Sequence, residues 1–264
     1  MKKLSLNCMN ENSSLHFPLL LIALLLFSIS AEAKVNLPAV LADNMVLQQQ
    51  TDVKLWGQAQ PKATLIVKTS WNNKTYKATA DNQGKWELSV ATPPAGGPYE
   101  ITFNDGEPLT LRNIGEVWFC SGQSNMEMPM GGFDRQPAQG TNDIIAKAKA
   151  STPIRIYNTD SKDGRWIRQS SKTPQEDCLG EWLENTPENV SHTSAAAYYF
   201  ARYIQEVLDV PVGIIISTLG GSKVEAWMSR EAISPFKSID LSILDNDEKI
   251  KNLTNTPCVL YNAK

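Results

Sequence analysis

The segment from Ser194 to Gly221 constrains the fold most strongly. Its first half, up to Leu208, has a helical periodicity. One face of this helix is expected to carry Ala197, Phe200, Ala201, Ile204 and Leu208. An apolar strand at 210–216 follows and leads into the glycine-rich loop 218–221. This order is typical of an α/β fold whose mainly parallel sheet is buried on both faces.

Residues 34–112 have a different pattern. Short β-branched or aromatic runs begin near residues 53, 64, 75, 85, 99 and 109, with Gly, Pro and Asn turns between them. Short strands at this spacing predict a β-sandwich, which we interpret as an accessory domain. The α/β part is then expected to occupy residues 113–264.

The N-terminus is typical of a secretory signal at residues 1–33. Lys2 and Lys3 precede the apolar run Phe17–Ile29, and Ala31 and Ala33 fit a cleavage site. A retained membrane anchor is the alternative. The signal predicts export to the periplasm or the extracellular space, without membrane contact after cleavage.

Composition excludes several functions. With 25 Lys and Arg against 28 Asp and Glu, the chain has a net charge of −3, which argues against nucleic-acid binding. Beyond the signal stand Cys120, Cys178 and Cys258, an odd number that allows at most one disulfide. Cys120 is expected to be buried, and no Cys or His spacing indicates a metal or cofactor site.

Ser124 is the candidate nucleophile. It follows the apolar strand Val117–Cys120, and Gly122 permits a sharp turn before it. A serine on such a turn presents its hydroxyl at the sheet edge, where ligands of α/β sheets bind. The alternative is that Ser124 only caps the helix that follows.

A longer string around Ser124 resembles a known family. Residues 115–127 (GEVWFCSGQSNME) are similar to the nucleophile block of the sialate O-acetylesterases, which belong to the SGNH hydrolases. Residues 41–48 and 210–227 resemble further blocks of the family in the same order. The resemblance implies a flavodoxin-like sheet, incomplete in this chain, preceded by a β-domain.

The resemblance also implies roles for individual residues. Ser124 matches the nucleophile, whose amide also serves the oxyanion hole, and Gly221, or alternatively Gly220, matches the glycine that donates a second amide. Candidate substrate-binding residues are Gln123, Asn125, Gly220 and Trp227. For Trp227, packing is the simpler role and lining the pocket is the alternative.

The chain offers no evident catalytic base. His192 is the histidine beyond the signal, and we interpret it as a polar residue at a helix entry, with a divergent base as the alternative. The family's Asn-bearing block and its Asp-x-x-His-like segment do not occur here. We therefore expect the chain to end partway through the catalytic domain, to be inactive alone and to self-associate through uncovered sheet.

Three functions remain in competition at this stage. The first is a secreted serine esterase that removes O-acetyl groups from sialic acid on glycans, with an acetylated sialoglycan as its partner. The second is an acetyl-xylan or other polysaccharide acetylesterase. The third is a non-catalytic glycan-binding protein derived from such an enzyme.

Overall fold

The computed structural model describes residues 35–104, 106, 108–111, 113–159, 161–162, 165–166, 169–246 and 253–264. The signal predicted at residues 1–33 lies outside this part of the chain. Within it, no helix combines the length and apolarity that crossing a membrane would need.

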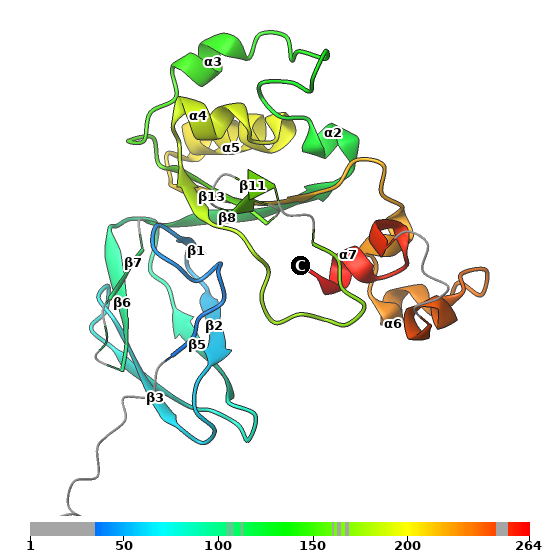
Figure 1. Cartoon of the computed structure of the whole chain (residues 1–264). Helices are drawn as coiled ribbons and strands as arrows, with labels where there is room; N and C mark the ends of the chain where they lie inside the picture. The colour runs from blue at the N-terminus through cyan, green and yellow to red at the C-terminus, as the bar shows by residue number, and fades with distance from the viewer. Residues whose placement is uncertain are drawn as a thin grey trace, which may run out of the picture. The chain divides into compact units, whose positions relative to one another are not determined.

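A five-stranded, mainly parallel sheet organises the α/β part (Figure 1). Its order is β1 (Val46–Gln48), β8 (Asn113–Gly122), β13 (Val212–Thr218), β9 (Ile154–Asn158) and β12 (Trp182–Glu184). The first four strands run parallel, and β12 is antiparallel to β9. The parallel sheet expected from the sequence is therefore confirmed. Its edge strand β1 comes from the segment that we assigned to the β-domain.

Helix α5 (Ala195–Leu208) begins where the sequence predicts. The Ser194 hydroxyl caps it by accepting a hydrogen bond from the Ala197 amide, and Asp209 ends it in a left-handed conformation. Its buried face consists of Ala197, Tyr198 and Ala201. The prediction was wrong for Phe200 and Leu208, which are 37% and 50% exposed. Figure 1 shows α5 and α4 (Pro187–Ser191) on one face of the sheet.

All six antiparallel strands expected before residue 112 are present. They form a two-stranded sheet, β2–β5, and a four-stranded sheet in the order β4-β3-β6-β7. Their bounds are β2 Asp52–Gln58, β3 Thr64–Thr69, β4 Thr75–Thr79, β5 Lys85–Ala91, β6 Tyr99–Phe103 and β7 Leu109–Leu111. Whether they form a separate β-sandwich domain stays a prediction.

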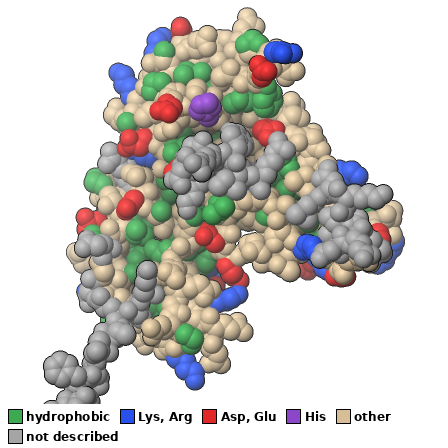
Figure 2. Space-filling model, viewed as in Figure 1, with side chains coloured by type: hydrophobic (Ala, Val, Ile, Leu, Met, Phe, Trp, Pro, Cys, Tyr) green, Lys and Arg blue, Asp and Glu red, His purple; other side chains and the backbone are tan. Residues whose placement is uncertain are grey.

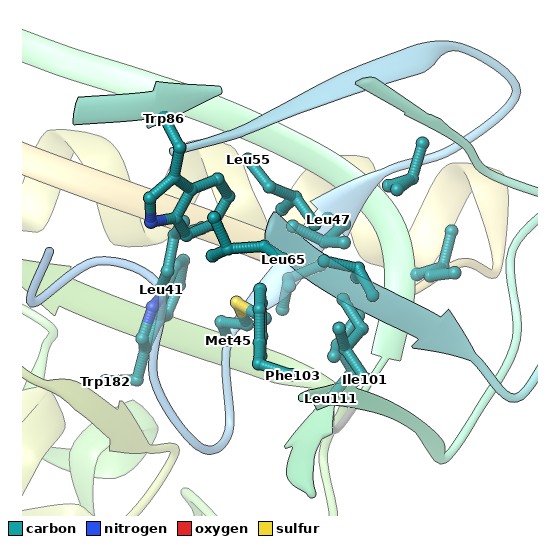
Figure 3. Close-up of a cluster of buried hydrophobic side chains, with 14 of the residues drawn as sticks. Leu41, Met45, Leu47, Leu55, Leu65, Trp86, Ile101, Phe103, Leu111 and Trp182 are labelled. Carbon is teal, nitrogen blue, oxygen red and sulfur yellow. The ribbon is translucent and has the colours of Figure 1, made fainter. Parts of the chain in front are cut away.

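One apolar cluster joins these strands to the segment around β1 and to β12 (Figure 3). It contains Leu55, Leu65 and Trp86 together with Met45 and Trp182. The Trp182 indole also donates a hydrogen bond to the Val40 carbonyl. Packing thus crosses the boundary that we placed near residue 112.

Short elements complete the described chain. After β8 come α2 (Ser124–Glu127) and α3 (Asn142–Ala146), and β10 pairs with β11. The last part of the chain packs around its own apolar cluster. Its elements are η1 Val224–Trp227, α6 Arg230–Ile233, η2 Leu241–Asp245, η4 Leu253–Asn255 and α7 Val259–Asn262, and those of the β pair are β10 Ser161–Lys162 and β11 Arg165–Trp166.

Strand β8 departs from the expectation of a sheet buried on both faces. Its neighbouring residues Trp118 and Phe119 point to opposite faces and are 42% and 59% exposed. Trp118 is covered in part by Phe200, whose ring meets it edge-on at 5.0 Å between centroids. The sheet therefore keeps apolar surface exposed on both faces at β8.

The three cysteines of the described chain are free thiols. Cys120 is 9% exposed, which confirms the expected burial, and Cys258 is fully buried. Burial raises the pKa of each of the Cys120, Cys178 and Cys258 thiols.

Candidate active site

Ser124 lies just after β8, the neighbour of the central strand β13, at the first position of α2. The turn before it is tight because Gly122 packs against Met126, where an added Cβ would come within 2.9 Å of the Met126 Cβ. The Ser124 side chain is exposed. Gln123 occupies the N-cap position, and no side chain caps this helix. The alternative that Ser124 serves as a helix cap is therefore wrong.

The glycine-rich loop reaches the same edge of the sheet. Strand β13 runs parallel to β8 with Thr218 opposite Gly122, so both strands end together. The Leu219 amide donates to the Gly122 carbonyl at 3.1 Å, which joins the two loops. A Cβ built on Gly220 would lie 3.6 Å from the Ser124 Cβ. Two segments almost a hundred residues apart in sequence thus meet at Ser124.

Two side chains from the Ser124 segment hold the glycine loop. The Glu127 carboxylate accepts a hydrogen bond from the Gly220 amide at 2.7 Å. The Gln123 side-chain amide donates to the Ser222 carbonyl at 2.5 Å. Because both contacts link α2 and its entry turn to the backbone of 220–222, they fix the distance between Ser124 and the loop.

The two glycines differ in what their amides can do. Because the Gly220 N–H is directed at Glu127, it is occupied. Gly221 is exposed, adopts φ +73°, and its N–H donates no hydrogen bond to a described residue. A positive φ is unstrained for glycine and costly for other residues. Gly221 is therefore the glycine whose amide is open to a ligand.

Trp227 and Ser222 stabilise the glycine-rich loop through two side-chain hydrogen bonds. The Trp227 indole N–H donates to the Ser222 hydroxyl at 2.9 Å, and that hydroxyl donates to the Leu219 carbonyl at 2.6 Å. Ser222 is buried. These contacts favour the packing role for Trp227. Asn125 is exposed, beside Ser124 on α2.

The described residues place no base against Ser124. His192 is exposed in the turn between α4 and α5, and no hydrogen bond joins it to Ser124. Figure 2 shows this histidine, in purple, at the surface. Asp43 and Asp177 accept hydrogen bonds from the Thr110 and Ala39 amides. Among the described residues there is also no group of His, Cys, Asp or Glu side chains that could hold a metal ion.

The chain was compared with known proteins. No family model matches it. It is 28% identical over 214 residues to human sialate O-acetylesterase and 27% identical over 242 residues to the mouse protein of that name. The chain is a homologue of the sialate O-acetylesterases. Its structure is similar, with TM-score 0.69 and 31% identity, to a carbohydrate acetylesterase from Xanthomonas citri.

These relatives are longer than the chain. The alignments cover 72% and 82% of the chain but only 38% of the human and 42% of the mouse sialate O-acetylesterase. The structural match covers 87% of the chain and 47% of the Xanthomonas acetylesterase. The chain thus spans less than half the length of each of these proteins.

One residue of the sialate O-acetylesterase-like block was missed by sequence reasoning. Glu127 lies in the string that carries the resemblance, three residues after Ser124. Residues three apart on a helix share a face, so this spacing places a carboxylate beside a serine at the first helical position. That spacing was the available signal. The acceptor role toward Gly220 depends on a long-range contact that the string does not contain.

Proposed function

We propose that the protein is a serine carbohydrate esterase that hydrolyses O-acetyl groups on sugars, with Ser124 as its nucleophile. One observation carries this proposal. The exposed Ser124 and the Gly221 amide, which donates to no described residue, lie at the same sheet edge, in segments joined by the Glu127–Gly220 hydrogen bond. The homology to sialate O-acetylesterases supports the acetyl ester as the substrate.

The mechanism is acyl transfer in two steps. The Ser124 hydroxyl oxygen attacks the acetyl carbonyl while a base takes its proton. The Ser124 and Gly221 amides then donate hydrogen bonds to the oxyanion that forms. Collapse of this intermediate releases the sugar hydroxyl, which receives the proton, and leaves an acetyl ester on Ser124. Water attacks that ester and releases acetate, which restores the serine.

The base is the part of this mechanism that the described residues do not supply. His192 is exposed in a turn that pairs with the chain beyond α2, where the Gly131 amide donates to the Ser191 carbonyl. We therefore assign the base to polypeptide outside these 264 residues and expect the chain alone to be inactive. Sialate O-acetylesterases more than twice as long as the chain support this assignment.

Two substrate classes fit the site. O-acetylated sialic acid is the first, because the curated relatives are named for it. Acetylated xylan or another neutral polysaccharide is the second, because the structural relative is named more broadly as a carbohydrate acetylesterase. Either substrate agrees with export through the signal proposed at residues 1–33.

Acetate release by the native protein, isolated from its source, tests the proposal. O-acetylated sialic acid and acetylated xylan are offered separately to the wild type and to Ser124→Ala. We expect Ser124→Ala to lose at least about a thousandfold in kcat/KM. Ser121→Ala, which removes an exposed hydroxyl from the preceding strand β8, is the matched control. Equal turnover by Ser124→Ala would refute the assignment, and sugar binding without any acetate release would favour the non-catalytic function.

A further inference from the structure

A pocket of about 540 Å³ opens beside the β2–β5 sheet, away from the residues around Ser124. Strands β2 and β5 contribute Trp56, Gln58, Lys85 and Glu87 to its lining, and the chain around Glu176 contributes from a distant part of the sequence. Its volume lies within the range of small-molecule sites, roughly 300–1,000 Å³. None of its lining residues belongs to the proposed active site.

Trp56 gives the pocket a fixed aromatic surface. Its side chain is half-buried, and its indole N–H donates to the Glu176 carbonyl at 3.2 Å. This hydrogen bond occupies the polar edge of the ring and sets its orientation. The remaining exposed ring is apolar, so it suits the C–H face of a pyranose, which is the apolar side of a sugar.

Acceptor groups surround this ring. The carboxylates of Asp81, Glu87, Glu176 and Asp177 all line the pocket. One oxygen of Asp81 accepts from two backbone amides, and one oxygen of Asp177 accepts from the Ala39 amide. Each carboxylate has a second oxygen that can accept from a ligand, as carboxylates do from several donors at once. Sugar hydroxyls are donors of this kind.

The charges select among ligands. Glu176 is paired with Lys85, and Glu87 with Lys54. The two aspartates keep the pocket net negative, which repels an anionic sugar such as sialic acid. The two lysine pairs weaken the attraction for a cation. A neutral saccharide is therefore the ligand that this lining fits best.

The floor of the pocket adds an independent observation. Trp86 lines it and is 3% exposed, and its indole nitrogen has no hydrogen-bond partner among the residues that the structure describes. The edge of the ring next to that nitrogen lies near Gly57, where the Asn36 carbonyl oxygen already fills the space, 2.4 Å from the position of an added Cβ. A buried donor without a partner is uncommon in proteins and calls for an acceptor.

We propose that this pocket is a binding site for a neutral pyranose unit of a polysaccharide, stacked on Trp56. The site goes beyond the proposed esterase activity because it needs neither Ser124 nor a base. It would hold the glycan that carries the ester, independently of the chemistry.

Calorimetric titration of the purified chain with xylohexaose and cellohexaose tests this site. We expect one of them to bind, and Trp56→Ala to weaken that binding at least about tenfold. Trp71→Ala is the matched control, because Trp71 also donates its indole N–H to a backbone carbonyl but does not line the pocket. Circular dichroism verifies that both variants fold.

A second variant keeps the test decisive if Trp56→Ala does not fold. Glu87→Gln removes a charge from an exposed side chain and should weaken binding severalfold without unfolding the chain. The proposal fails if neither hexasaccharide binds, if binding is the same in the Trp56 and Glu87 variants as in the wild type, or if sialyllactose or spermidine binds more tightly than both neutral sugars. Because no ester is involved, these outcomes are separate from failure of the esterase proposal.

Discussion

Replacing Glu127 with alanine tests how the Ser124 segment is joined to the glycine loop. The substitution removes the carboxylate that accepts the Gly220 N–H at 2.7 Å, in a half-buried setting. A hydrogen bond to a charged group contributes about 1.5–3 kcal/mol to stability. Because Gly221 beside it is exposed, water can reach the freed amide, and we expect a loss near the lower figure.

Thermal unfolding measures this loss. For a chain of this size, about 1.5 kcal/mol corresponds to a melting temperature lower by about 3–6 °C. Glu127→Gln keeps an acceptor oxygen without the charge, so we expect a smaller decrease. Glu206→Ala changes an exposed glutamate on α5 and should alter stability by less than about 0.5 kcal/mol.

Activity provides a second readout of the same contact. A loop displaced by about 1 Å can lower turnover by roughly a hundredfold. In the native protein we therefore expect Glu127→Ala to lower kcat more than it raises KM, with Glu127→Gln in between. Wild-type melting temperature and kcat in Glu127→Ala would refute the reasoning.

Four further predictions concern Gly221, the cysteines and strand β8. Gly221→Ala forces a residue with a side chain to adopt φ +73°, so we expect the free energy of unfolding to fall by about 1–2 kcal/mol. An unchanged urea concentration at the midpoint of unfolding would contradict this expectation. Burial raises the pKa of Cys120, Cys178 and Cys258 above the ordinary 9.0, so iodoacetamide at pH 8 should label the buried Cys120 and Cys258 only after denaturation and the half-buried Cys178 slowly. Because the folded chain keeps these thiols neutral, the unfolded chain loses its thiol protons first as the pH rises above 9. The free energy of unfolding should therefore be unaffected by these thiols below pH 9 and should decrease at higher pH, which urea titrations at alkaline pH would show. Light scattering should detect self-association of the purified chain, reduced by Phe119→Gln, and a sharp monomer peak for the wild type would oppose this.

The sequence predicted those parts of the fold that depend on local patterns. The strands of the β-rich half and the start of α5 at Ser194 follow from alternation, turn residues and a capping serine, and the structure has them. The resemblance implied one oxyanion hole for Ser124 and the glycine loop, and the two segments do meet where the parallel strands β8 and β13 end.

The features that the sequence did not predict depend on packing between distant segments of the chain. Periodicity gave α5 an apolar face but could not tell that Tyr198 would turn to the core while Phe200 stayed beside Trp118. The sequence favoured Gly221 but left Gly220 as an alternative, because the contact that distinguishes them is with Glu127, ninety-three residues away from Gly220. Trp56 was read only as part of a strand, since its pocket is completed by Glu176.

Labelling with an esterase-directed fluorophosphonate tests the central claim most directly. The native protein, isolated from its source, is treated with the reagent and digested, and peptide masses locate the adduct. The account predicts a single modified residue, Ser124, and loss of acetate release in step with its modification. Full modification of another serine, with Ser124 unmodified and acetate release abolished, would contradict it.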